Sequence, residues 1–232
     1  MRIGVMQPYF MPYIGYWQII NHVDEYVIYD DVNFIKGGWI NRNRILVNGE
    51  PKYINIPMIG ASSNKKINEI EISTDKVLKD KIFRKLEMSY QRAPFYYDVM
   101  DMMCRVIYNN ENNLAIYLKK SIEEICGYLN IRTNLVLSSQ IDKTEGLKSE
   151  ERLLDICKRL KATEYYNSIG GKGLYSKDNF NREGIKLFFL KTNDIEYKQF
   201  NDIFIPNLSI IDVMMFNDIN TIQQYLTKYE LQ

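Results

Sequence analysis

Residues Met6–Ile45, which read MQPYFMPYIGYWQIINHVDEYVIYDDVNFIKGGWINRNRI, decide the fold. Together with Ile3–Val5 before them, they begin with a strand-like run that breaks at Gln7-Pro8. The apolar segment Ile14–Ile20 predicts a short helix, and Glu25–Tyr29 predicts a second strand. Two strands joined by a short helix are typical of a parallel sheet with a crossover, whose ligands gather at the carboxyl ends of the strands. This stretch therefore predicts both the sheet and the position of a site.

The remainder of the chain continues this alternation of strands and helices. Asn48-Gly49 is a strong turn signal and predicts a hairpin over residues 45–57. Apolar residues recur at helical spacing between Lys76 and Asn130, with a break at Ala93-Pro94. Further strands are expected at Ile67–Ile72, Thr133–Ser138, Thr163–Ser168 and Ile185–Lys191, and further helices after the capping residues Ser73–Asp75, Ser149 and Ser209 and from Asn220 to the end. The sequence thus predicts one α/β domain over residues 1–232, with a mostly parallel Rossmann-like sheet, helices on both faces and a central helical insert at 76–130.

Composition narrows the classes of partner. Hydrophobic residues make up 46% of the chain and charged residues 25%, a balance typical of a globular protein. The formal net charge is only +1, so no overall field favours DNA or a membrane surface. The chain opens on a strand-like run rather than a signal peptide, and no apolar run reaches the roughly 18–20 residues of a membrane span. We therefore expect a cytoplasmic protein without a membrane span.

Cysteine and histidine usage limits the possible chemistry. Cys104, Cys126 and Cys157 are widely spaced, match no zinc or redox spacing, and are expected to be buried free thiols. His22 is the only histidine, which speaks against a histidine–carboxylate triad and excludes a multi-histidine metal site. It falls at the end of the first predicted helix, where interaction with the helix terminus is a sufficient role. The sequence therefore names no metal ligand and no cofactor.

The first candidate binding residues follow the opening strand: Gln7, Tyr9, Tyr13, Gly15 and Tyr16. Their strand–loop–helix placement resembles the entrance of the HxGH nucleotidyltransferases, in which a glycine admits a nucleotide and histidines contact phosphate. Tyrosines stand here in place of both histidines, which speaks against that mechanism but leaves room for a nucleotide pocket. The alternative is an aromatic plug in the core, with each buried hydroxyl hydrogen-bonded.

Asp30 and Asp31 end the second predicted strand and are candidate catalytic residues, together with Gln7 as a neutral donor. Adjacent carboxylates on a strand point to opposite faces, so the two are not expected to form one dyad. A carboxylate acts as a base near neutral pH only when burial raises its pKa. We predict that one of them is the base, and the alternative is a solvated turn. Ser209 and Asp212, in contrast, fit a variant of the helix capping box and are assigned to structure.

A polar and aromatic set follows between residues 36 and 44. It comprises Lys36, Trp39, Asn41, Arg42, Asn43 and Arg44. Arginine holds phosphate or carboxylate through two parallel hydrogen bonds, and tryptophan offers a flat face to a base or a sugar. We predict substrate binding here, with both arginines as phosphate clamps and Asn41 as a neutral donor. The alternative is a charged edge strand with its arginines in solvent.

A glycine-rich loop follows the strand predicted at Thr163–Ser168. Backbone amides in such loops approach phosphates closely, so the run SIGGKGLY at residues 168–175 is a second candidate binding segment. It has neither Walker A spacing nor a G-x-G-x-x-G fingerprint. We expect it to share one pocket with the opening motif. Its candidate residues are Ser168, Gly170, Gly171 and Lys172.

As ordered motifs, these stretches resemble the WbqC-like family. The similarity rests on QPYFMPYIGYWQ, YDDV and GWINRNRI in the opening stretch, on Ala93-Pro94, on the glycine-rich segment and on the late run FIPNLSIID. The resemblance implies occurrence in bacterial O-antigen (lipopolysaccharide) and other surface-polysaccharide gene clusters. It also implies a proposed role in attaching glycine to an amino sugar.

The resemblance and the residues together favour an acyltransferase or aminoacyltransferase, glycyl in the first instance, acting on a nucleotide-linked amino sugar. Such a reaction needs deprotonation of the sugar ammonium, positioning of two substrates and donors for a developing oxyanion. The acyl donor is left among a thioester, an adenylate and a charged tRNA, and the near-neutral net charge disfavours tRNA. Two alternatives remain: a nucleotide-dependent activating enzyme related to the HxGH nucleotidyltransferases, and a nucleotide-sugar-binding protein without chemistry.

Overall fold

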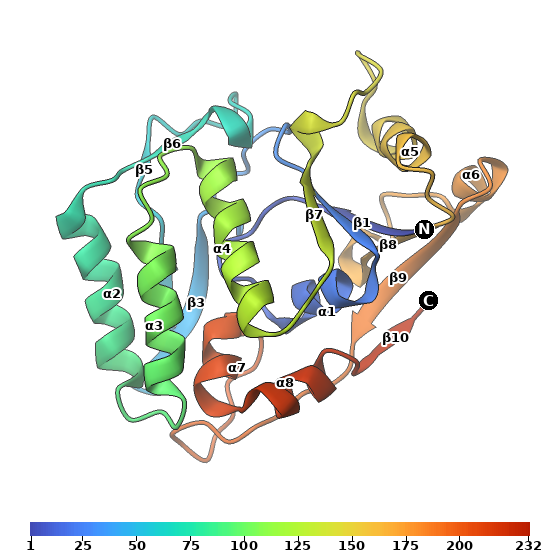
Figure 1. The fold of residues 1–232 in the computed structure, drawn as a ribbon. Helices are drawn as coiled ribbons and strands as arrows, with labels where there is room; N and C mark the ends of the chain where they lie inside the picture. The colour runs from blue at the N-terminus through green and yellow to red at the C-terminus, as the bar shows by residue number, and fades with distance from the viewer.

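The computed structural model describes all residues 1–232 and is organised on one six-stranded sheet (Figure 1). The strand order is β10-β9-β8-β1-β2-β7, so β1 (Arg2–Met6) lies inside the sheet. Every neighbouring pair is parallel except β9 and β10. The chain passes from β1 to β2 and β7 on one side and then to β8 and β9 on the other, as in a doubly wound sheet. The predicted Rossmann-like fold class is confirmed.

The other elements have the following bounds. The remaining strands of the large sheet are β2 (Glu25–Ile28), β7 (Asn134–Leu137), β8 (Glu164–Ser168), β9 (Lys186–Thr192) and β10 (Tyr229–Leu231). Two small antiparallel sheets pair β3 (Arg42–Val47) with β4 (Glu50–Asn55), and β5 (Met58–Ile59) with β6 (Glu71–Ile72). The helices are α1 (Ile14–His22), α2 (Lys76–Tyr90), α3 (Tyr96–Ile107), α4 (Leu114–Tyr128), α5 (Ser149–Arg159), α6 (Lys177–Arg182), α7 (Ile210–Phe216) and α8 (Ile219–Tyr225). Short 3-10 turns occupy Ile67–Glu69, Ser138–Gln140 and Ile169–Gly171.

Helices cover both faces of the large sheet because successive strand residues point to opposite sides. On one face Ile3 and Val5 of β1 share a buried cluster with Leu153 and Ile156 of α5 and Phe180 of α6. Figure 1 shows α5 and α6 together at the upper right. The larger core on the other face takes in residues of α1, α3, α4, α7 and α8. Burial of apolar area on both faces is the main stabilising contribution to such a three-layer fold.

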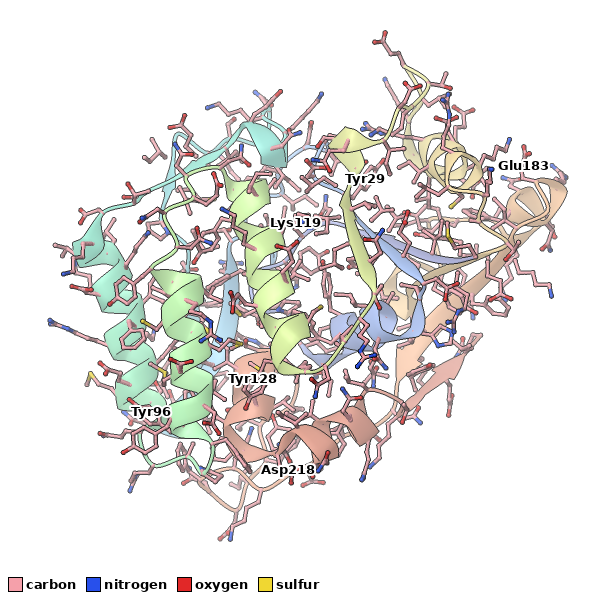
Figure 2. The ribbon with its side chains drawn as sticks, viewed as in Figure 1. Tyr29, Tyr96, Lys119, Tyr128, Glu183 and Asp218 are labelled. Atoms are coloured by element: carbon pink, nitrogen blue, oxygen red, sulfur yellow. The ribbon has the colours of Figure 1, made fainter.

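The helical insert predicted at residues 76–130 is present as α2, α3 and α4. The Asp75 carboxylate accepts the Val77 N–H at 2.8 Å and caps α2, as predicted from its place in the capping run. Figures 1 and 2 show the three helices side by side, with Tyr96 at the start of α3 and Tyr128 at the end of α4. The insert thus packs as one block beside the sheet.

The hairpin forms where Asn48-Gly49 predicted it. The two residues have φ values of 52° and 79°, the left-handed pair that a two-residue hairpin turn requires. The first strand of the hairpin begins at Arg42, so the arginines of the GWINRNRI motif lie on β3. This early start places the motif against the loop that leaves β1.

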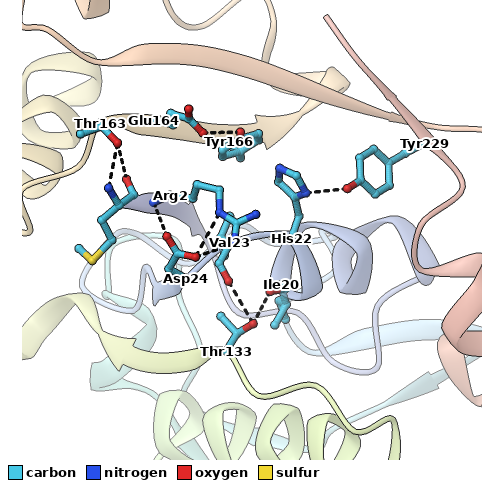
Figure 3. A network of polar contacts seen from close by, with 11 residues as sticks. Arg2, Ile20, His22, Val23, Asp24, Thr133, Thr163, Glu164, Tyr166 and Tyr229 are labelled. Atoms are coloured by element: carbon cyan, nitrogen blue, oxygen red, sulfur yellow. Dashed lines mark hydrogen bonds and ion pairs between the residues drawn. The ribbon is translucent and has the colours of Figure 1, made fainter.

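A polar network ties together the amino ends of the sheet (Figure 3). Arg2 of β1 forms an ion pair with Asp24 at 2.6 Å. His22 Nδ1 lies 2.6 Å from the Tyr229 hydroxyl, so the only histidine links the end of α1 to β10. Burial lowers the pKa of His22, with the Arg2 charge adding to the effect. His22 is therefore a structural group at the edge opposite the strand carboxyl ends.

Three local predictions of secondary structure are wrong. Ile67–Ile72 is not one strand, because a 3-10 turn occupies its first half and only Glu71–Ile72 pairs with β5. Ser149 does not cap α5, since Lys148 is the N-cap and no side chain bonds there. The segment predicted as a helix from Asn220 ends early, and the tail pairs with β9 as β10. That pairing covers a sheet edge that would otherwise expose its backbone groups.

All three cysteines are free, but only Cys126 and Cys157 are buried, and Cys104 is exposed on α3. The prediction of three buried thiols is therefore wrong for Cys104, which lies on the solvent side of an amphipathic helix. Burial raises the pKa of each buried thiol to about 12, so neither supplies a thiolate at neutral pH. None of the helices combines the length and the apolar character that crossing a bilayer requires.

Candidate functional site

The strand order reverses between β1 and β8, and ligands of doubly wound sheets bind beside such a reversal at the carboxyl edge. The loop Gln7–Tyr13 leaves β1 at this edge and leads into α1. Two adjoining cavities lie beside the N-terminus of α1 and share Tyr13 and Asn207 in their walls. We call them the aromatic cavity and the acidic cavity, after the side chains that distinguish them.

The aromatic cavity has a volume of about 290 Å³. The Arg44 guanidinium lies over Trp39, with its central carbon 5.7 Å from the ring centroid, and Tyr9 adds a second aromatic surface. Burial raises the pKa of Tyr9, so its hydroxyl stays protonated near neutral pH. Aromatic faces beside a guanidinium suit a nucleobase or sugar joined to a phosphate. The full lining is Tyr9, Pro12, Tyr13, Trp39, Asn43, Arg44 and Asn207.

Hydrogen bonds to the backbone fix the loops that carry these side chains. The Phe10 N–H donates to the Trp39 carbonyl at 3.1 Å, and the buried Asn43 amide donates to the Phe10 carbonyl at 3.1 Å. The Arg42 guanidinium donates to both carbonyls of Gly37-Gly38. Arg42 therefore holds the turn before Trp39 and lines neither cavity.

The acidic cavity has a volume of about 350 Å³ and lies between α1, α7 and residues 192–208. Asp194 and Glu196 line it, and neither carboxylate has an ion-pair or hydrogen-bond partner within the chain. The Tyr197 hydroxyl, also in the lining, donates to Asp212 at 2.8 Å. Much of the remaining wall is apolar, from Ile14 on α1 to Val213 on α7.

The first turn of α7 forms hydrogen bonds to the segments that make the walls of both cavities. Its N-cap Ser209 accepts the Ile211 N–H, as predicted, while its hydroxyl donates to the Met11 carbonyl at 2.7 Å and its N–H to the Arg44 carbonyl at 2.8 Å. Asp212 does not close a capping box. Burial raises the pKa of this fully buried carboxyl group, against the hydrogen bonds that it receives from Tyr197, Tyr90 and Gln199.

Close packing at the start of α1 requires Gly15. A Cβ at this position would lie 2.5 Å from Thr192 Oγ1 and 2.5 Å from the Tyr13 hydroxyl. Tyr16 is fully buried, and its hydroxyl donates to the Gln7 carbonyl at 3.2 Å. Gly15 therefore seats Tyr13 between the cavities, whereas Tyr16 has the core position that the alternative interpretation predicts.

Asp30 is buried beyond the end of β2 and is held by hydrogen bonds on both carboxylate oxygens. Oδ1 accepts the Ser139 N–H at 2.9 Å, and Oδ2 accepts the Ser139 hydroxyl at 2.6 Å and the Asn68 amide at 3.4 Å. The residue joins β2 to the turns at 138–140 and 67–69. It lines neither cavity.

Asp31 forms partly buried ion pairs with Arg152 at 2.6 Å and Lys143 at 3.0 Å. Burial alone would raise the pKa of Asp31, but hydrogen bonds from Lys143 and Ser138 and the Arg152 charge outweigh burial and lower it. A carboxylate with a lowered pKa is a weak base. The Arg152 guanidinium also lies 5.3 Å from the ring centroid of Tyr29, which Figure 2 labels near the carboxyl end of the sheet.

The remaining predicted binding residues lie outside both cavities. Gly171 is buried against Asn167, and Lys172 donates to the Gln232 side chain at 3.0 Å. The structure thus does not bring the glycine-rich loop into the cleft that the opening motif lines, and a role of this loop in binding stays a prediction. The residues concerned are Lys36, Asn41, Ser168, Gly170, Gly171 and Lys172.

Sequence reasoning missed the cavity residues Asp194, Glu196 and Tyr197. They lie between β9 and α7 in a segment without regular secondary structure, so no hydrophobic period marks them. The available signal was the run FIPNLSIID, whose Asn207 has a left-handed φ of 57° and belongs to both cavities.

Comparison with known proteins extends along nearly the whole chain. The model of the WbqC-like protein family matches residues 7–224, a range that contains every residue lining the two cavities. The uncharacterized protein Rv1507c of Mycobacterium tuberculosis is 29% identical over 219 residues, which cover 93% of each chain. No solved structure matches the chain.

Proposed function

The chain belongs to the WbqC-like protein family, and we propose that it transfers an acyl or aminoacyl group, glycyl in the first instance, to a nucleotide-linked amino sugar of bacterial surface-polysaccharide (O-antigen) assembly. One observation carries the proposal: the aromatic cavity and the acidic cavity adjoin at Tyr13 and Asn207. A nucleotide-linked amino sugar has an aromatic base and a diphosphate at one end and an ammonium group at the other. Its two ends therefore match the two cavities in order.

The aromatic cavity supplies the nucleotide contacts in this proposal. Trp39 and Tyr9 would contact the base, and Arg44 would hold the diphosphate. Arg44 Nη2 donates to the Asn207 carbonyl at 3.2 Å, but the buried Nε–H has no partner. A buried donor without a partner costs about 1–3 kcal/mol, so a phosphate oxygen placed there would recover that cost.

The start of α1 supports transfer rather than binding alone. Tyr13 is the N-cap, but its side chain makes no capping hydrogen bond. The N–H groups of Ile14 and Gly15 have no acceptor within the chain. Free amides at a helix N-terminus favour negative charge, such as the oxyanion that develops in acyl transfer. Asp30 and Asp31 stay predicted bases, although both are engaged in the contacts described above.

Binding and transfer assays test the proposal in sequence. Calorimetry with nucleoside diphosphates and their amino-sugar derivatives should show binding that Arg44→Ala weakens and Lys172→Ala, a control outside both cavities, leaves unchanged. Incubation with glycyl thioester, glycyl adenylate or glycyl-tRNA should then yield an amide of glycine and the amino sugar, detected by mass spectrometry. Tight binding without transfer from any donor would favour the nucleotide-sugar-binding alternative, and no binding at all would overturn the proposal.

A further inference from the structure

The ends of three neighbouring strands bring tyrosines together beside the point where the strand order reverses. Tyr9 follows β1, Tyr29 follows β2, and Tyr175 ends the glycine-rich loop that follows β8. Because β1 pairs with both β2 and β8, these three carboxyl ends are adjacent. Ligands of doubly wound sheets bind at such a place, yet neither cavity takes in a residue of the turns that follow β2 or β8. The proposed contacts with the nucleotide sugar therefore leave these strand ends free.

The hydroxyls of the three tyrosines lie within electrostatic range of one another. Burial raises the pKa of Tyr9 and of Tyr29, and the Tyr175 hydroxyl adds to the rise in both. For Tyr29 the positive charge of Arg152 opposes the rise. The hydroxyls of Tyr9 and Tyr29 have no hydrogen-bond partner in the chain, and neither is fully buried. They are therefore protonated donors that a ligand can reach.

Arg152, near the start of α5, supplies a positive charge beside these hydroxyls. Its guanidinium carbon lies 5.3 Å from the Tyr29 ring centroid, and its Nη2 pairs with Asp31 at 2.6 Å. The side chain is only 22% exposed, but Nε and Nη1 have no partner in the chain and neither is fully buried. A guanidinium held by a carboxylate and an aromatic face, with two donors free, suits a phosphate. We call Tyr9, Tyr29, Tyr175 and Arg152 the strand-end group.

The carboxylate that positions Arg152 lacks one hydrogen bond. Asp31 is buried, and its Oδ2 takes both Arg152 and Lys143. Its Oδ1 is also buried but accepts no hydrogen bond from the chain, and a buried acceptor without a donor is destabilising. The neighbouring Asp30 is occupied by Ser139 and does not share these contacts. Asp31 and Arg152 together therefore leave one acceptor and two donors unused.

These unused groups define the class of ligand. The guanidinium donors and the phenol hydroxyls match the oxygens of a phosphate, and Asp31 Oδ1 needs a donor such as a hydroxyl. A ribose phosphate carries both groups close together. A thioester of coenzyme A, an adenylate and a charged tRNA all contain this unit.

Resting on the proposed function, we infer that the strand-end group is the acyl-donor subsite, which binds the ribose phosphate of the donor. Arg152 and Tyr29 hold the phosphate, while Asp31 positions Arg152 and accepts a ribose hydroxyl. Tyr9 belongs to the strand-end group and also lines the aromatic cavity. The acyl donor and the nucleotide sugar therefore bind on either side of one side chain, as transfer between them requires.

Matched nucleotides test the subsite without any need for turnover. Calorimetry is done in an Arg44→Ala background, which removes the phosphate contact of the aromatic cavity. AMP should bind about tenfold or more tightly than adenosine, because adenosine lacks the group that Arg152 holds. Arg152→Gln should abolish this preference, and Arg159→Gln, on the same helix, is the matched control. In the Arg44→Ala background, 2′,3′-dideoxyadenosine monophosphate should bind about threefold to tenfold more weakly than AMP.

A second variant keeps the test valid if Arg152→Gln does not fold. Tyr29→Phe preserves the ring beside Arg152 and should weaken AMP binding about threefold to tenfold. Tyr97→Phe, on the exposed side of α3, should leave it unchanged. Urea unfolding of each variant shows whether a change in binding comes from the site or from the fold.

Equal affinity for AMP and adenosine overturns the inference, and so does a preference that survives unchanged in Arg152→Gln and Tyr29→Phe. Equal affinity for AMP and its dideoxy form overturns the hydroxyl contact with Asp31. Displacement of AMP by coenzyme A assigns a thioester donor, displacement by tRNA assigns a charged tRNA, and displacement by neither assigns an adenylate. Failure of nucleotide sugars to bind the wild type would overturn the proposed function alone, because the AMP measurements do not involve them.

Discussion

The carboxyl edge of the sheet contains two acidic regions with opposite local chemistry. At the end of β2, Ser139 bonds both carboxylate oxygens of Asp30, and Lys143 and Arg152 form ion pairs with Oδ2 of Asp31, whose Oδ1 is left without a partner. In the acidic cavity, Asp194 and Glu196 have none. The first pair sits where a parallel sheet is expected to carry its catalytic groups, yet its contacts serve to join strands and turns. The position of a carboxylate at a strand end therefore indicates only that it lies near a candidate site. Whether it has hydrogen-bond and ion-pair partners decides if it holds the structure together or is free to contact a ligand.

The largest expected effect comes from removing the carboxylate of Asp31, which is held by ion pairs. Asp31→Ala leaves Lys143 and Arg152 as two partly buried cations without their common carboxylate. Removing one partner of a buried ion pair costs about 3–5 kcal/mol, which urea unfolding would measure as a lower midpoint. Asp194→Ala is the matched control and should change the unfolding free energy by less than about 0.5 kcal/mol. Asp31→Asn with intact stability and abolished turnover would instead restore the base prediction and remove the contrast between the two regions.

The next largest expected effect comes from the close packing of Gly15 against Tyr13. Gly15→Ala places a methyl group 2.5 Å from both Thr192 Oγ1 and the Tyr13 hydroxyl, so we expect a loss of about 1–3 kcal/mol and weaker ligand binding. Gly127→Ala is the control, because a Cβ at that position on α4 meets nothing within 4 Å. It should stabilise the helix by roughly 0.5–1 kcal/mol. Equal thermal midpoints in both variants would show that Tyr13 moves aside freely and does not define the cleft.

The two arginines of the GWINRNRI motif sharpen the comparison further. Arg44→Lys keeps the charge but loses the planar guanidinium that can make two parallel hydrogen bonds. We therefore expect about tenfold weaker binding of the nucleotide sugar by calorimetry. Arg42→Lys should weaken binding less, because Arg42 bonds the Gly37-Gly38 carbonyls and lines neither cavity. A greater loss in the Arg42 variant would mean that the clamp is the other arginine.

The smallest effect is expected at the amino edge, away from both acidic regions. Burial lowers the pKa of His22 below its ordinary value of 6.5, so the folded chain takes up a proton less readily than the unfolded chain. The free energy of unfolding should therefore decrease as pH falls below about 6.5 and stop decreasing below the folded-state pKa. His22→Gln should flatten this part of a urea-midpoint profile. A profile that rises on acidification would contradict the lowered pKa.

Short sequence patterns predicted the strands, the helix and the hairpin whose conformation depends mainly on neighbouring residues. Ile3–Met6, Ile14–Ile20 and Glu25–Tyr29 correspond to β1, α1 and β2, because short apolar runs between turn residues have few other solutions. Asn48-Gly49 was sufficient for the hairpin, because only a left-handed pair fits its turn. Repeated crossovers between these runs predicted a mostly parallel sheet, but they did not predict the strand order.

Only half of the candidate site, the lining of the aromatic cavity, could be predicted from the sequence. Tyr9, Tyr13, Trp39 and Arg44 were found because they cluster in one stretch of sequence after a strand. The acidic half is made by Asp194 and Glu196, which belong to an irregular segment and meet α1 only through tertiary packing. No single-sequence pattern states that a carboxylate lacks a partner, since that property depends on every neighbour in three dimensions.

The cleft joins parts of the chain that the ribosome delivers at different times. Tyr13 and Arg44 emerge long before Asn207, which lies with them in the aromatic cavity. At about 5–20 residues per second, the early segments wait on the order of ten seconds for the late one. β1 likewise waits for β8, its partner in the middle of the sheet. A chain that lacks residue 207 therefore has no Asn207 wall for the aromatic cavity, and ligand binding there requires that this residue has been made.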